Sequence, residues 1–196
     1  SEWQNSEICH KLSAFLQEHA GTTMQHVDKI ICFGLGCFPS KHERAQKRAY
    51  TQHLAALTIR SILATQQGGP APPVFTQEPI YCAAGITHIV SPSPFNFTVL
   101  DDPEGFRALD GNTFILSVAP NVPVRQIVLG MTHTFGGPAG MFCDEIQSEG
   151  LECNGKGSEI DGNQRRFTPY KTCEPSPALW KYKQEGVWME CGDWEG

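Results

Sequence analysis

The sequence predicts an α/β protein with a mostly parallel sheet of about five strands and helices on both faces. Short apolar segments rich in β-branched residues alternate with segments of helical periodicity, a pattern typical of this class. The segment 113–118 is a nearly unbroken apolar run, as in a strand that a parallel sheet buries on both faces. The segment 29–40 has the pattern of a strand, a glycine loop and the start of a helix. Because the carboxyl ends of parallel strands meet at one edge, the segments that follow them should lie close together.

The expected elements follow in chain order. A first helix is expected after Ser6, whose side chain can accept a hydrogen bond from the first turn. Strands are expected at 30–33, 74–76, 97–100, 113–118 and 139–142. Further helices are expected at 42–65, at 80–90 and after Asn121. From residue 147 the periodicity fades, so we expect one domain over 1–146 and an irregular tail over 147–196 that packs on it through aromatic side chains.

The composition limits the classes of function. A chain of 196 residues with 40% hydrophobic residues can bury one core of ordinary size. No apolar run approaches the roughly 20 residues of a membrane span, and no basic and apolar leader opens the chain. The formal charge of −6 argues against a protein that coats nucleic acid with its whole surface, but a local basic patch can still contact one.

The cysteines indicate a reducing compartment. Eight of them lie at wide, irregular spacings without a CxxC pair. We interpret them as reduced thiols of a cytoplasmic protein, and we expect neither a metal nor a cofactor. The alternative for Cys153, Cys173 and Cys191 in the tail is a disulfide or a zinc site.

The first loop is the centre of the predicted site. Gly34 and Gly36 let the backbone turn sharply and approach a ligand, while the following helix points free N–H groups at it. Ser40 is a candidate N-cap of that helix, and Cys37 is expected on the rim. The alternative is a plain strand-to-helix turn, because Pro39 stands where a dinucleotide fingerprint has its third glycine.

Cations gather at the start of the long helix. Lys41, Arg44 and Arg48 fall at i, i+3 and i+7, on one face. Cations near a helix N-terminus oppose its dipole, so local stability does not explain the cluster, whereas a bound anion would. A solvated face with Glu43 as the local partner is the alternative.

Carboxylates follow the third expected strand directly. Asp101, Asp102 and Glu104 repel one another unless a guanidinium, an ammonium or a divalent metal compensates their charge. A solvated acidic turn is the alternative, because Asp, Pro and Gly are common turn residues.

Three further residues are expected at the same edge. Glu78 ends the second strand, and in a dinucleotide site it would bind ribose, although its separation from Gly36 is about twice the usual 20 residues. Asn121 is expected to cap the helix after the fourth strand, and Arg125 would face the same edge from that helix.

Several motifs together resemble a known family. They are CFGLGCF with the helix after it, QEPIY at 77–81, VLDDPEGFRALD at 99–110, SVAPNVPVRQI at 117–127 and PAGMFCDEI at 138–146. This combination resembles the Sensitivity to Red light Reduced domain in its fungal form. The resemblance implies a Rossmann-like α/β sheet, in a family of which much is regulatory or uncharacterised.

A second resemblance is to fungal enzymes that join arginine to another amino acid from aminoacyl-tRNAs, giving arginine-containing cyclic dipeptides. Those enzymes have a motif of two aspartates and a glutamate, and the motif at 101–104 is similar, with its glutamate one position earlier. The resemblance implies that the cation cluster meets a tRNA acceptor end and that the acidic trio holds an arginine guanidinium. Cys37 and Ser40 are the candidate nucleophiles.

Three functions follow from these patterns. The first is an aminoacyl-transferase-like enzyme that forms an arginine-containing cyclic dipeptide. The second is a non-catalytic regulatory or ligand-binding module for a phosphorylated small molecule or a partner protein. The third is a nucleotide-cofactor oxidoreductase, for which the glycine fingerprint is incomplete. His42, His53 and His133 are interpreted as surface or packing residues.

Overall fold

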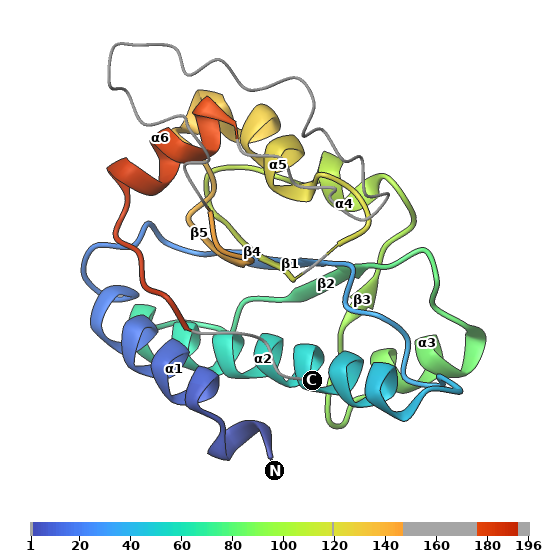
Figure 1. Cartoon of the computed structure of the whole chain (residues 1–196). Helices are drawn as coiled ribbons and strands as arrows, with labels where there is room; N and C mark the ends of the chain where they lie inside the picture. The colour runs from blue at the N-terminus through green and yellow to red at the C-terminus, as the bar shows by residue number, and fades with distance from the viewer. Residues whose placement is uncertain (1, 119, 147–175, 192–196) are drawn as a thin grey trace, which may run out of the picture.

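A parallel sheet forms the centre of the molecule. The structure, a computed structural model, describes residues 2–118, 120–146 and 176–191. Within these residues the strands are β1 (Lys29–Phe33), β2 (Val74–Gln77), β3 (Thr98–Val99), β4 (Thr113–Ser117) and β5 (Gly140–Cys143). They lie in the order β3-β2-β1-β4-β5, and every pair is parallel (Figure 1). The predicted α/β class and five-stranded parallel sheet are confirmed.

Helices cover both faces of the sheet (Figure 1). One face carries α1 (Glu7–His19), α2 (Glu43–Gln67) and α3 (Ala83–Val90), and the other carries α4 (Glu104–Arg107), α5 (Val124–Thr132) and α6 (Pro177–Glu185). Short 3-10 helices span Trp3–Asn5 and His133–Phe135. Across the described residues, no helix combines the length and apolarity needed to cross a membrane.

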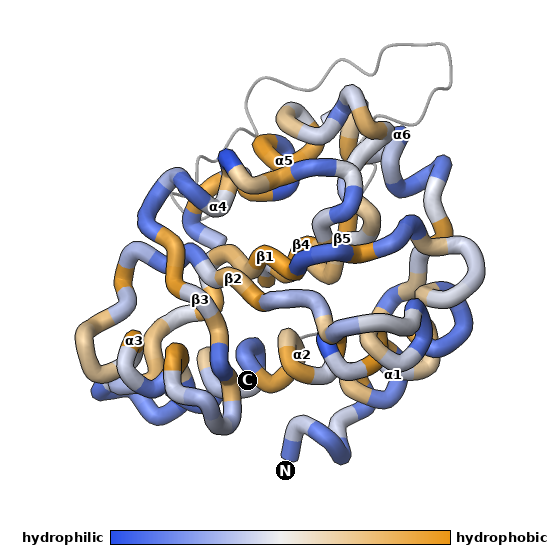
Figure 2. The backbone as a smooth tube through the Cα atoms, turned by 180° about the vertical axis from the view of Figure 1, so that it is seen from behind, coloured by the Kyte–Doolittle hydropathy of each residue, from blue (hydrophilic) through white to orange (hydrophobic). Residues whose placement is uncertain are grey.

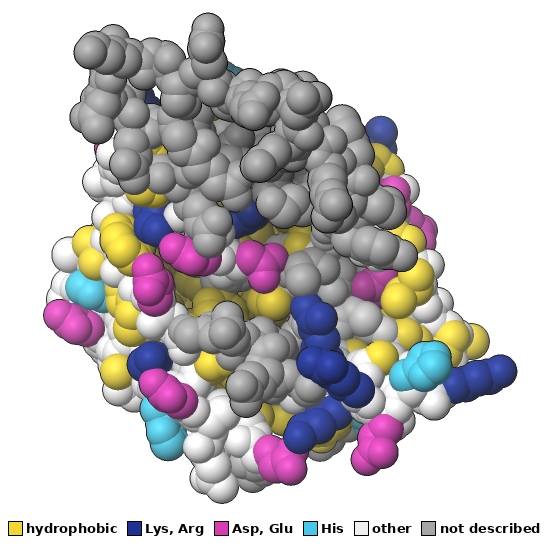
Figure 3. Space-filling model, viewed as in Figure 1, with side chains coloured by type: hydrophobic (Ala, Val, Ile, Leu, Met, Phe, Trp, Pro, Cys, Tyr) yellow, Lys and Arg dark blue, Asp and Glu magenta, His cyan; other side chains and the backbone are white. Residues whose placement is uncertain are grey.

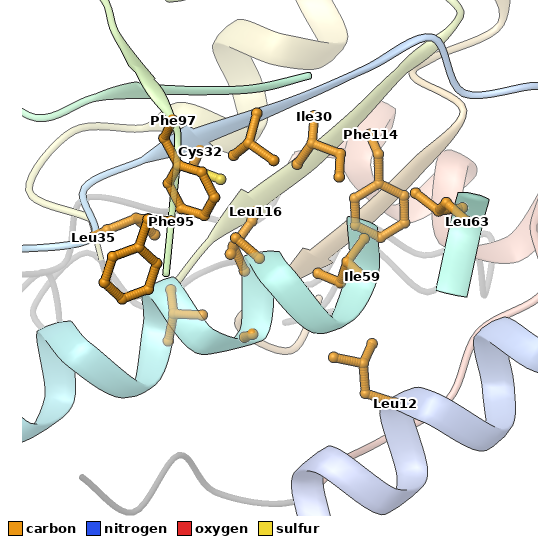
Figure 4. Close-up of a cluster of buried hydrophobic side chains, with 14 of the residues drawn as sticks. Leu12, Ile30, Cys32, Leu35, Ile59, Leu63, Phe95, Phe97, Phe114 and Leu116 are labelled. Carbon is orange, nitrogen blue, oxygen red and sulfur yellow. The ribbon is translucent and has the colours of Figure 1, made fainter. Parts of the chain in front are cut away.

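Alternate strand residues fill two cores, because successive side chains point to opposite faces of a sheet. Hydrophobic stretches of the chain lie in the strands between the two helix layers (Figure 2). Towards α1 and α2, the strand residues Ile30 and Leu116 pack near Ile59 of α2 (Figure 4). Towards α4 and α5, Ile31 and Ile115 pack with residues of α5. All four strand residues are fully buried, which explains the unbroken apolar pattern of β1 and β4.

Several helix starts differ from the sequence prediction. The N-cap of α2 is His42 rather than Ser40, because the Ser40 hydroxyl accepts a hydrogen bond from the His42 N–H at 3.2 Å instead. The N-cap of α5 is Pro123, so Asn121 precedes the helix without capping it. The helix expected at 80–90 begins only after Cys82, whose thiol is its cap.

The described part of the expected irregular tail contains a helix, α6. Ser176 caps α6 by accepting a hydrogen bond from the Leu179 N–H at 3.2 Å. Tyr182 of this helix donates to the Pro138 carbonyl oxygen at 3.2 Å, which attaches α6 to the segment before β5. After α6 the chain runs past the β5 edge to the α1 side of the sheet, where Cys191 packs on the larger core (Figure 1).

Candidate functional site

The loops after β1, β2 and β3 meet at the carboxyl edge of the sheet around one residue, Gln77. Gln77 ends β2 and is only 5% exposed. Its main-chain oxygen accepts from the Gly34 N–H at 3.2 Å, its Nε2 donates to Asp102 Oδ1 at 2.8 Å, and its Oε1 accepts from the Gly105 N–H at 2.7 Å. The glycine loop and the acidic turn therefore lie at the same edge. Sequence reasoning did not select Gln77, although a polar residue at the end of a buried strand was the available signal.

Glu78 closes the glycine loop. Its Oε2 accepts from the Gly36 N–H at 2.8 Å, and its Oε1 accepts from the Ile80 N–H at 3.2 Å. Gly34 and Gly36 have φ values of +71° and +76°, a conformation that favours glycine. In a dinucleotide site a phosphate oxygen would receive such loop N–H groups. Here a carboxylate of the chain itself takes that position at Gly36, so this N–H is already satisfied.

Two cysteines that are distant in the sequence lie together at this edge. The Sγ atoms of Cys37 and Cys82 are 3.4 Å apart, and the Cys82 N–H donates to Cys37 Sγ at 3.3 Å. Cys82 is exposed, and its Sγ accepts from the Gly85 N–H in the first turn of α3 at 3.4 Å. This hydrogen bond, with help from Cys37, lowers the pKa of Cys82, whereas burial raises the pKa of Cys37. Sequence reasoning selected Cys37 and missed Cys82.

A buried hydrogen-bond chain holds the loop after β2. His53 Nδ1 lies 2.7 Å from the Ala49 carbonyl oxygen, which can only accept, so this nitrogen carries the proton. His53 Nε2 then accepts from the Tyr81 hydroxyl at 2.8 Å, whose oxygen accepts from Thr76 Oγ1 at 2.8 Å. Burial lowers the pKa of His53 to about 4. The chain connects α2, β2 and the residue next to Cys82.

The carboxylates after β3 are exposed and two of them have partners. Asp102 accepts from Gln77, and Glu104 Oε1 pairs with Arg107 Nη1 at 2.7 Å. The Asp101 carbonyl oxygen accepts from the Glu104 N–H at 2.7 Å, which closes the turn. The trio is thus part of an ordered turn that presents Asp101 and the outer oxygens of its neighbours to solvent.

The predicted cation cluster lies where α2 begins. Lys41 and Arg44 are exposed, and Arg48 is half-buried. Lys47, beside them, pairs with Glu2 at 3.0 Å. A row of Lys and Arg side chains is visible over this part of α2 (Figure 3). We name Lys41, Arg44 and Arg48 the cation row.

Comparison with known proteins gives the family. The SRR1 domain matches residues 12–181, a span that includes every strand and the carboxyl-edge loops. The chain belongs to the SRR1 domain family. No curated protein and no solved structure matches it. The first resemblance is therefore confirmed at the level of the family, while the resemblance to cyclic-dipeptide-forming enzymes has no support from these comparisons.

The two predicted site residues after β4, Asn121 and Arg125, lie in different environments in this SRR1 domain. Asn121 is exposed in the loop before α5. Arg125 is 7% exposed, and its Nη1 donates to the carbonyl oxygens of Asp144 and Glu145, each at 2.9 Å. Arg125 thus joins α5 to the segment after β5, which is a structural role among the described residues.

Two cavities lie on the β5 side of the SRR1 domain. One of about 360 Å³ lies between α1, β5 and α6, and one of about 380 Å³ lies at the carboxyl end of β5. Both are lined in part by Trp188 and Met189, which follow α6. None of the predicted site residues lines either cavity.

The described residues contain no group of three His, Cys, Asp or Glu side chains placed to hold a metal ion. Cys191 is a half-buried free thiol, and Cys153 and Cys173, the other candidates for a tail disulfide or zinc site, lie outside the described residues.

Proposed function

We propose that this SRR1 domain is a regulatory binding module that holds a phosphorylated ligand against the cation row. The observation that carries the proposal is the exposure of Lys41 and Arg44, with Arg48 half-buried, at the start of α2 in a chain of formal charge −6. Positive side chains at this end of a helix oppose the helix dipole. A bound phosphate would compensate this unfavourable arrangement.

The contacts of the glycine loop indicate that the phosphorylated ligand binds elsewhere than at Gly36, where a dinucleotide phosphate would bind. Glu78 already accepts the Gly36 N–H, so a phosphate there would have to displace a carboxylate that is well placed for two hydrogen bonds. The cation row offers side chains instead of backbone donors. The acidic turn at 101–104 lies at the carboxyl edge beside Gln77, and its carboxylates are exposed.

Binding at several salt concentrations tests the proposal. A labelled tRNA mixture and, separately, a labelled nucleoside triphosphate distinguish RNA phosphates from those of a free small molecule. Arg44→Ala with Arg48→Ala should weaken binding of at least one probe. For RNA it should also reduce the slope of log K against log salt by about 1.4 to 1.8, since each phosphate contact contributes about 0.7 to 0.9.

The matched control removes two cations elsewhere. Lys11 is partly exposed and Lys181 is exposed, and each pairs with a glutamate one helical turn away, so their loss should cost little stability. Lys11→Ala with Lys181→Ala changes the net charge equally and should leave the salt slope close to that of the wild type. Equal binding by the two double variants would refute the cation row as the binding surface.

A second candidate is acyl transfer from aminoacyl-tRNA, and one observation favours it. The exposed Cys82 thiol, whose pKa is lowered, lies beside Cys37 at the same edge as Asp102. A thiolate can accept an aminoacyl group from an ester, and a carboxylate can hold an arginine guanidinium. If the protein has this activity, incubation with arginyl-tRNA and a mixture of charged tRNAs should yield an arginine-containing cyclic dipeptide. The Asp102→Asn variant should not form this product. If mass spectrometry detects no cyclic dipeptide with the wild-type protein, the acyl-transfer hypothesis is refuted.

A further inference from the structure

Two thiols face each other across loops that are distant in the sequence. Cys37 lies in the loop after β1, and Cys82 precedes α3. Their sulfur atoms are 3.4 Å apart, so forming a bond of about 2.05 Å requires an approach of about 1.4 Å. The Cys82 N–H also donates to Cys37 Sγ, which holds the two residues in register.

The surroundings give the two sulfurs different roles. Cys82 is exposed, and its Sγ accepts the Gly85 N–H at the start of an eight-residue helix, which favours the thiolate. Cys37 is half-buried behind it. A Cβ atom on Gly85 would lie 2.6 Å from Cys37 Sγ, so the glycine is what lets this sulfur lie against α3.

We propose that Cys37 and Cys82 form a reversible disulfide in exchange with low-molecular-weight disulfides of the glutathione type. The Cys82 thiolate attacks one sulfur of the small disulfide and releases one small thiolate. Cys37 then loses its proton and attacks Cys82 Sγ, which releases the second small thiolate. Two protein thiols are oxidised and one small disulfide is reduced to two thiols. The reaction goes beyond the proposed binding of phosphate and does not depend on it.

The bond would fix the carboxyl edge covalently. It would join the loop that contains Gly36 to the segment that contains Glu78, which non-covalent contacts such as the Gly36–Glu78 hydrogen bond now hold together. Two of the other free cysteines differ from this pair, because Cys9 and Cys32 are buried and burial strongly raises the pKa of Cys32.

Peptide mapping after equilibration with glutathione tests the proposal. The full chain is incubated at graded ratios of oxidised to reduced glutathione, quenched in acid with a maleimide and digested with trypsin. Cleavage after Lys and Arg places Cys82 in peptide 61–107 and Cys37, together with Cys32, in peptide 30–41. We expect these two peptides to become linked as the ratio rises and to separate again on reduction, and fragmentation should assign the bond to Cys37.

Three variants make the outcome decisive. Cys37→Ser should leave Cys82 as a mixed disulfide with glutathione, and Cys82→Ser should remove both the link and glutathione from this pair. Cys143→Ser, which changes a partly exposed thiol on β5, should form the link as the wild type does. Circular dichroism verifies that each variant is folded. A wild-type chain that accumulates glutathione on Cys82 without linkage, or a link that persists in Cys37→Ser, would overturn the proposal.

Discussion

Acidification should destabilise the fold through His53. This residue is fully buried on α2, and burial lowers its pKa from 6.5 to about 4, with the charge of His88 as a smaller cause in the same direction. The unfolded chain therefore takes up a proton near pH 6.5, while the folded chain does so only near pH 4. Since the unfolded state binds more protons in this window, stability falls as the pH falls.

The size of the effect follows from the two pKa values. Between pH 7 and pH 5 the linkage relation gives a loss of about 2 kcal/mol, and the total by pH 4 is about 3 kcal/mol. Above pH 6.5 the contribution of the neutral, buried His53 to the free energy of unfolding is almost fully present. With a urea m-value of about 2 kcal/mol per molar, the loss by pH 5 corresponds to a fall of about 1 M in the urea midpoint.

Urea unfolding at pH 7, 6 and 5 measures this dependence. His53→Gln provides the comparison, because glutamine has a similar size and can form hydrogen bonds but does not titrate. The variant will differ in absolute stability, yet its midpoint should fall less between pH 7 and pH 5 than that of the wild type. If both proteins lose the same stability over this range, the reasoning about the neutral, buried His53 is refuted.

Two further pairs of substitutions test the buried hydrogen bonds and the packing. Tyr81→Phe removes a hydroxyl that bridges two buried polar groups and should cost about 2 kcal/mol of folding stability, a fall in Tm of about 4 to 8 °C. The control Tyr50→Phe, at a residue that is 41% exposed, should change Tm by less than about 2 °C. Equal shifts of Tm in calorimetry would contradict the role of the Tyr81 hydroxyl. Gly140→Ala would place a Cβ 2.7 Å from the buried Phe114 ring and should cost about 1 to 3 kcal/mol in urea unfolding. Gly130→Ala, in open space on α5, should instead stabilise by up to about 1 kcal/mol, and the opposite order of midpoints would count against the packing argument.

The fold was predictable because burial on both faces leaves a strong pattern. The strands β1 and β4 are buried on both sides and are apolar almost throughout, so the sequence alone locates them. Short elements gave no such signal. Helix α4 has four residues, too few to show a helical period, and the Asp-Asp-Pro sequence before it is equally typical of a turn. The N-cap of α2 was wrongly predicted because Ser40 uses its hydroxyl in a local turn, a use that competes with capping.

The candidate site was predictable only to the level of the sheet edge. Topology places the segments after parallel strands together, so the proximity of Gly34 and Asp102 follows from the strand assignment. The contacts that organise the edge connect residues far apart in the sequence, as Glu78 does with Gly36 and Cys37 does with Cys82. No local sequence pattern indicates such pairs. The Glu78 carboxylate, for example, was expected to bind a ligand, and in the structure it accepts a hydrogen bond from the Gly36 N–H.

The path of the chain after α6 has a consequence for association between copies. A strand at the border of a sheet exposes unpaired N–H and C=O groups that can recruit another chain. After α6 the chain goes past the β5 border, where part of 187–191 lines a cavity together with β5, and the border strands are short, with four residues in β5 and two in β3. Neither border therefore offers a long open template, so this small parallel sheet carries built-in protection against edge-to-edge polymerisation.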